Sequence, residues 1–137
     1  MMKEREKVLQ KLYMQYQMLQ QHLENMQQQS KVIGTQLIDL MGTIQSLEDL
    51  KAVKEGTEIL VPISSGVYAK ARINDTSNLV VNVGADVTVS KSIDETKAVV
   101  ERQAEELEKI QNQVLTELQR LSVKAAAIEK EMSSLAE

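Results

Sequence analysis

The amino-acid sequence predicts a mainly α protein with a small β insert, built as a long antiparallel two-helix coiled coil joined by two β-hairpins. Three observations predict this fold. An apolar heptad pattern runs through the first part of the chain, a second one runs through the last part, and the segment between them is rich in Val and Ile with a period of two. The 137 residues form a single predicted domain, 1–137.

The composition favours thin apolar seams over a globular core. Phe, Trp and Cys are absent and only three tyrosines occur, although aromatic side chains usually supply much of the area that a core buries. Coiled coils bury apolar side chains along one stripe of each helix and need few aromatic residues. The composition therefore agrees with long paired helices.

Residues 1–55 have the spacing of a coiled-coil helix. Alternate steps of three and four residues from Leu9 meet an apolar side chain at every position except Ser30. This 3.5-residue period keeps one stripe facing a partner helix over many turns, and Gly56 suits the C-terminal cap. The predicted seam consists of Leu9, Leu12, Tyr16, Leu19, Leu23, Met26, Ser30, Ile33, Leu37, Leu40, Ile44 and Leu47.

Residues 92–137 predict a second coiled-coil helix. Ser92 and Glu95 have the Ser-x-x-Glu spacing of a capping box, which marks a helix start. Steps of seven from Ile93 meet only apolar residues, and the companion positions are mostly apolar as well. The predicted seam consists of Ile93, Lys97, Val100, Ala104, Leu107, Gln111, Val114, Leu118, Leu121, Ala125, Ile128, Met132 and Leu135.

Residues 56–91 have the composition and the two-residue period of β-strands. β-branched residues alternate with polar ones, and turn residues interrupt them at short intervals. Pro62 lacks an N–H for the strand ladder, so its strand is predicted to lie at an edge or to carry a bulge. Two hairpins result, with strands at 58–63, 67–73, 79–83 and 87–90.

These hairpins predict an oligomer. Two-stranded hairpins are marginal in water and leave strand edges unpaired, so strands of neighbouring subunits are expected to complete the sheet. The paired helices would then project from a shared β platform as an arm. The apolar strand residues predicted to form this oligomerisation surface are Ile59, Val61, Ile63, Val67, Ala69, Ala71, Ile73, Leu79, Val81, Val83, Val87 and Val89.

The free end of the arm is a predicted binding site for apolar partners. Each apolar residue there has one neighbouring helix instead of a surrounding core, and Met14 and Met18 add flexible thioethers. The alternative is that these residues only close the coiled coil. The predicted substrate-binding residues, called the terminal set below, are Val8, Leu9, Leu12, Tyr13, Tyr16, Ile128, Met132 and Leu135.

The sequence lacks the residues that other classes of function require. The chain has no cysteine and one histidine, His22, so no cofactor, metal site or enzyme activity is expected. The net charge is −4, with ten acidic and six basic residues from position 93 onward, which disfavours nucleic acid. No apolar run resembles a signal peptide or approaches the roughly 18 residues of a membrane span, so a cytoplasmic protein is expected.

The central segment resembles the α-class subunit of prefoldin, of the archaeal type. The stretch ILVPISSGVYAKA at 59–71 is similar to the first hairpin of that class, and VNVGA at 81–85 is similar to its second. Subunits of the β class have a single hairpin. The resemblance implies an ATP-independent holdase chaperone: a heterohexamer of two α-class and four β-class subunits, whose hairpins form a β-barrel platform.

The resemblance further implies that the coiled-coil tips hold unfolded client proteins and deliver them to a group II chaperonin. Two alternatives stay open. The chain could be a structural coiled-coil scaffold that oligomerises through its β region, or a homo-oligomeric filament-forming paralogue. Suppression of client aggregation separates a holdase from a scaffold, and the size of the lone chain identifies a filament.

Overall fold

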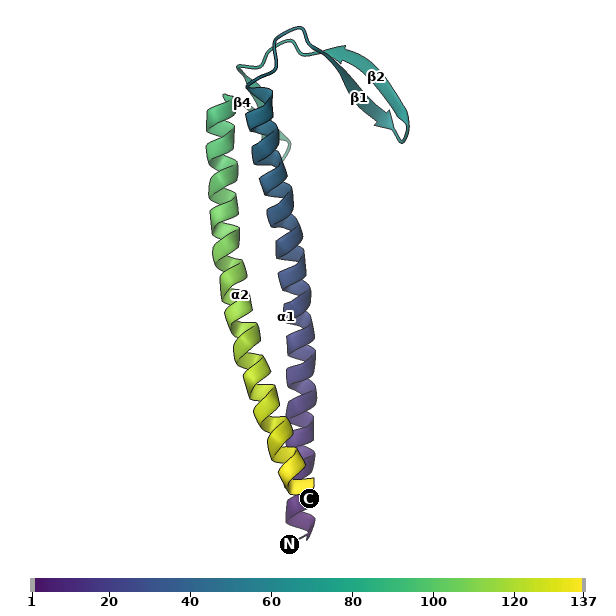
Figure 1. The fold of residues 1–137 in the computed structure, drawn as a ribbon, viewed down its shortest axis with the longest axis vertical. Helices are drawn as coiled ribbons and strands as arrows, with labels where there is room; N and C mark the ends of the chain where they lie inside the picture. Colours follow the sequence, from purple (N-terminus) through teal and green to yellow (C-terminus); the bar gives the residue numbers. More distant parts are fainter. Residues whose placement is uncertain (1, 137) are drawn as a thin grey trace. The chain divides into compact units, whose positions relative to one another are not determined.

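The computed structural model describes residues 2–136, so the chain ends of both predicted helices, Met1 and Glu137, lie outside the described residues. The order of elements confirms the predicted fold class: helix, two hairpins, helix (Figure 1). The elements are α1 (Met2–Leu50), β1 (Glu58–Ser64), β2 (Val67–Arg72), β3 (Leu79–Gly84), β4 (Val87–Lys91) and α2 (Ile93–Ala136).

The chain divides into two compact units. The first combines the residues up to position 37 with those from 107 onward, and therefore contains the N-terminal part of α1 and the C-terminal part of α2. The second, residues 38–106, contains the end of α1, both hairpins and the start of α2.

In the first unit the two helical segments run side by side in opposite directions (Figure 1). Their contact follows the predicted seam. Leu23 on α1 and Leu121 and Ala125 on α2 are buried together. Further seam residues pack around this cluster and are partly buried, namely Tyr16, Leu19, Met26 and Leu118.

Two of the three polar positions of the predicted seams, Ser30 and Gln111, meet each other in this unit, whereas the third, Lys97, belongs to the second unit. Gln111 Nε2 donates a hydrogen bond of 3.0 Å to the backbone carbonyl of Ser30. A Cβ on Gly34 would lie 3.9 Å from the same amide nitrogen, which is an ordinary van der Waals contact. Gln111 Oε1 is buried without a hydrogen-bond partner. The seam thus contains one polar layer between apolar ones.

In the second unit α2 begins as predicted. The backbone N–H of Glu95 donates to Ser92 Oγ at 3.0 Å, and the Ser92 N–H donates back to Glu95 Oε1 at 3.4 Å. This reciprocal pair is a capping box, and it satisfies donors that the first helical turn leaves free.

The end of α1 differs from the prediction of a helix over residues 1–55 capped by Gly56. The helix ends at Leu50, and Gly56 belongs to the first hairpin, where its N–H donates to the Ile73 carbonyl at 2.6 Å. The Ile73 N–H donates to the Thr57 carbonyl at 2.9 Å. These two bonds continue the ladder beyond β1 and β2, which explains why residues near Gly56 leave the helix.

The two hairpins form separate antiparallel two-stranded sheets, β1–β2 and β3–β4. The register of the first pairs Ile59 with Ala71 and Val61 with Ala69. It shifts between Pro62 and Ser64, which confirms the bulge predicted at the proline. The register of the second shifts between Asn82 and Gly84.

Candidate functional site

One face of the first hairpin is apolar throughout. Ile59, Val61, Ala69 and Ala71 share this face, because alternate strand residues point the same way and the register sets these residues opposite each other. Ile59, Val61 and Ala69 are exposed, Val61 to 38%, and Ala71 is half-buried. Such a face contributes little stability until another surface covers it.

The opposite face of the same hairpin also carries apolar side chains. Leu60, which is 61% exposed, stands opposite Lys70, and Pro62 stands opposite Tyr68. Every residue of β1 is exposed. A two-stranded sheet with bare faces and free edges is marginal by itself. Within residues 2–136, the first hairpin is therefore a surface that no other element covers fully.

The rest of the predicted oligomerisation surface divides into two groups. Ile63 and Val67 beside the first bulge are exposed, as are Val83 and Val87 beside the second turn. Half-buried positions lie on one face of the second hairpin and just beyond β2, namely Leu79, Val81, Val89 and Ile73. The second hairpin is thus partly covered in this chain, whereas the first is not.

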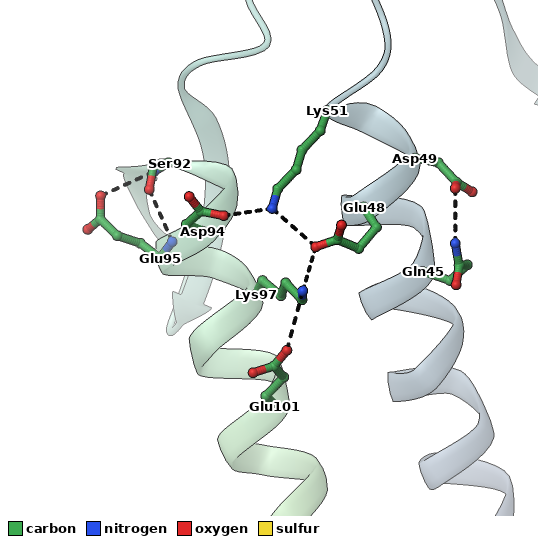
Figure 2. A network of polar contacts seen from close by, with 9 residues as sticks. All are labelled: Gln45, Glu48, Asp49, Lys51, Ser92, Asp94, Glu95, Lys97 and Glu101. Atoms are coloured by element: carbon green, nitrogen blue, oxygen red, sulfur yellow. Dashed lines mark hydrogen bonds and ion pairs between the residues drawn. The ribbon is translucent and has the colours of Figure 1, made fainter.

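An ion-pair network joins the end of α1 to the start of α2. Glu48 accepts hydrogen bonds from Lys97 and from Lys51, and Lys51 also pairs with Asp94 at 2.9 Å (Figure 2). Glu101 lies 3.7 Å from Lys97 on the same helix. The network ties together the two helix ends from which the hairpin segment departs.

The same contacts shift the pKa values of the charged groups. Hydrogen bonds from Lys97 and Lys51 hold the pKa of Glu48 below its ordinary value. Bonds to Asp94 and Glu48 raise the pKa of Lys51, and the bond to Glu48 raises the pKa of Lys97. Each group is therefore held in its charged form.

An open groove of about 820 Å³ lies between α1 and α2 in the first unit. It is called the terminal groove here. Leu9, Tyr13 and Met132, three members of the terminal set, line it together with Ala136. Its remaining lining residues are polar or charged: Lys3, Glu6, Lys7, Gln10, Glu129 and Ser133.

The other members of the terminal set lie elsewhere. Leu12, Tyr16 and Leu135 are half-buried and Ile128 is buried, as seam positions are expected to be. Val8 is exposed outside the residues that line the groove. Three members of the set therefore line the groove, four lie in the seam away from it, and Val8 lies outside both.

Sequence reasoning missed the charged rim of the groove. Lys3 and Lys7 are one turn apart on α1, and Glu129 lies on α2 one turn before Ser133. Their spacing places each pair on one helix face, but only the register of the two helices shows that both faces border one groove. Over residues 2–136, no helix could cross a membrane, and no three His, Cys, Asp or Glu side chains group as a metal site.

Comparison with known proteins agrees with this architecture. A family model described as prefoldin subunit matches residues 19–137. The prefoldin subunit alpha of Thermofilum pendens is 29% identical over 83% of this chain and 88% of its own. That of Pyrococcus horikoshii is 34% identical over 77% of this chain and 72% of its own.

A solved structure has the same fold. Filamentous prefoldin from Methanocaldococcus jannaschii, determined by electron cryo-microscopy, superposes with a TM-score of 0.73 over 85% of this chain and 96% of that chain, at 18% identity. Paired helices joined by β-hairpins, together with these matches, define a class of chaperone subunits that assemble with one another. The chain belongs to the prefoldin family.

Proposed function

We propose that the chain is the α-class subunit of a prefoldin and acts as an ATP-independent holdase for unfolded proteins. The single observation that carries this proposal is the terminal groove, where Leu9, Tyr13 and Met132 line an open surface between two helices. Exposed apolar surface of this kind marks interaction sites, and the flexible thioether of Met132 adapts to varied partners.

Assembly is proposed to occur through the hairpins, with β-class subunits in a heterohexamer of two α and four β chains. The apolar face of Ile59, Val61, Ala69 and Ala71, of which only Ala71 is half-buried, supports this, as do the free strand edges. Completing the sheet between subunits into a β-barrel would bury this face. The relatives named prefoldin subunit alpha support the choice of class.

Multivalency gives the holdase its affinity. Each groove offers a small apolar contact, and several arms that hold one client chain bind it far more tightly than a single arm does. Delivery of the client to a group II chaperonin in the cytoplasm belongs to the same proposal and rests on family membership.

The test replaces groove residues by glutamine, which is polar and a good helix former. A double variant, Leu9→Gln with Met132→Gln, replaces two apolar groove residues. A single variant, Tyr13→Gln, replaces a third groove residue, which is exposed and lies outside the seam. Light scattering of a denatured client, with the chain co-assembled with a β-class subunit, measures protection. Both variants should require several-fold more complex for equal protection.

Met41→Gln is the matched control, because Met41 is 64% exposed on α1 and lies outside the groove. It should protect as the wild type does. Circular dichroism checks that each variant keeps its helices. If Tyr13→Gln and the double variant both protect fully, the groove is not the client site and the holdase proposal fails. A complex that assembles but never protects is the scaffold instead.

A homo-oligomeric filament is a second candidate, favoured by one observation. The solved structure of the same fold is a filamentous prefoldin. Light scattering coupled to size-exclusion chromatography of the lone chain distinguishes the two assemblies. Large species whose mass grows with concentration indicate the filament, whereas a small species that reaches a fixed mass only with a β-class subunit indicates the heterohexamer.

A further inference from the structure

One outer face of α1 carries a row of two thioether side chains and one imidazole. Met14, Met18 and His22 follow each other at intervals of four residues, so they stack on one side of the helix, about 6 Å apart along its axis. All three are exposed, with Met18 at 71%. We propose that this row binds a soft monovalent metal ion, Cu(I) in the first place.

Two residues of the row, Met18 and His22, border the same surface depression. The depression is also lined by Leu19, Gln21 and Asn25. Residues four apart on a helix have Cβ atoms about 5–6 Å apart, which a thioether and an imidazole can bridge through one metal ion. Met18 and His22 are therefore the principal ligands, and Met14, one turn before Met18 and outside the depression, offers a further thioether.

The donor set selects the ion. Thioether sulfur is a soft ligand that favours Cu(I), and imidazole nitrogen suits copper as well. The chain has no cysteine to compete as a thiolate. Hard ions such as Mg²⁺ and Ca²⁺ prefer several oxygen ligands, often carboxylates, whereas the residues that line this depression offer oxygen only from the side-chain amides of Gln21 and Asn25. Binding is coordination only, so water leaves the ion and no covalent bond of the protein changes.

The next residue in the same spacing shows where the row ends. Met26 continues the four-residue interval, but it is half-buried and packs against the core cluster of Leu23, Leu121 and Ala125. The Met26 side chain therefore packs in the seam and does not extend the exposed row. The site is also separate from the terminal groove, whose lining includes none of Met14, Met18 and His22, so it does not depend on the proposed holdase function.

The test uses Ag(I), a redox-inert soft ion, added to the full chain in its native assembly. Methionine methyl groups labelled with ¹³C report each thioether, and His22 is the single histidine, so its ring signal is unique. With one equivalent of Ag(I), the Met14, Met18 and His22 signals should shift together. The methyl signal of Met41, exposed to 64% on the same helix, should stay in place.

Variants test the ligands individually. Met18→Leu and His22→Gln should each weaken Ag(I) binding by about tenfold or more, because even the loss of a residue that supports a metal ligand costs about 10–100-fold. Met41→Leu should bind as the wild type does. Leucine and glutamine preserve the helix, and circular dichroism verifies this.

Two results would overturn the site. If Met41 shifts in parallel with Met14 and Met18, the ion binds any exposed thioether. If the His22 signal does not respond to Ag(I), or His22→Gln binds normally, the row is not a joint site. Neither result affects the client-binding experiment, since the groove variants leave this row unchanged.

Discussion

The turn of the second hairpin holds two residues other than glycine in the left-handed region. Ala85 has a φ of 50° and Asp86 a φ of 60°. A two-residue hairpin loop with positive φ at both positions matches the right-handed twist of its strands, and glycine or asparagine usually occupies it. Alanine has a Cβ and no side-chain hydrogen bond to offset the cost of this conformation.

Ala85→Gly should therefore raise the free energy of unfolding by about 1 kcal/mol. Thermal unfolding, followed by circular dichroism at fixed chain concentration, measures the change. The same substitution at an exposed helical position is the control: Ala98→Gly in α2 should lower stability by about 1 kcal/mol. If both substitutions destabilise the protein equally, the strain at Ala85 is absent.

At the scale of elements, the seam between the paired helices contains one layer whose hydrogen bonding is incomplete. Gln111 donates to the Ser30 carbonyl, but its own Oε1 is buried without a partner. An unpaired buried acceptor costs about 1–3 kcal/mol, and a polar seam residue fixes the register of a coiled coil at the expense of stability.

Gln111→Leu should raise the free energy of unfolding by about 1 kcal/mol, because it replaces an unpaired carbonyl with an apolar side chain. Chemical denaturation measures this. Gln113→Leu, at an exposed position of the same helix, should change stability by no more than about 0.5 kcal/mol. A large loss of stability in Gln111→Leu would mean that the hydrogen bond to Ser30 outweighs the unpaired oxygen.

The ion-pair network makes the junction between α1 and α2 sensitive to acid. The lysine hydrogen bonds hold the folded-state pKa of Glu48 below its ordinary value of 4.5. A lowered carboxyl pKa contributes stability that is present above about pH 4.5 and is lost as the pH falls through the folded-state value.

Glu48→Gln should therefore reduce stability above pH 4.5 and flatten the loss of stability below it. Thermal unfolding between neutral pH and about pH 3 measures both effects. Glu105→Gln, at an exposed position of α2, serves as the control and should keep the wild-type pH profile. An unchanged profile in Glu48→Gln would show that the network adds nothing to folding in solution.

Assembly, at the scale of the whole molecule, is expected to depend on one face of the first hairpin. Val61→Asp places a charge among Ile59, Ala69 and Ala71, where burial of an unpaired charge is costly. The proposed assembly with β-class subunits should dissociate, which light scattering after size-exclusion chromatography detects. Leu60→Asp, on the opposite face and across from Lys70, is the matched control and should assemble. Normal assembly of Val61→Asp would refute the proposed interface.

Much of the fold could be predicted from particular residues. The heptad steps placed Ser30 and Gln111 in the two seams, where they meet, and the capping box and the bulge at Pro62 are present as expected. Each of these signals is local. A proline without an N–H disturbs a ladder in any sheet, and a serine three residues before a glutamate caps a helix in any protein.

The errors and omissions involve contacts between distant residues. The helix ends at Leu50 instead of continuing to 55, since Gly56 bonds to Ile73 across the hairpin. The position of the groove could not be predicted either, because Leu9 and Ile128 obey the same apolar spacing while only Leu9 borders the groove. The spacing of apolar residues along one helix does not show which residues of the partner helix lie opposite them.

The sequence by itself determined the element types, the seams, the turns and the helix start at Ser92, since periodicity, caps and proline chemistry act within a few residues. The tertiary structure alone decided which apolar residues are covered and which stay open: Leu121 buried in the seam, Tyr13 in the groove, Val61 bare on its hairpin. The reason is physical. Burial depends on what faces a side chain from elsewhere in the chain, and the register of two helices or strands sets that partner.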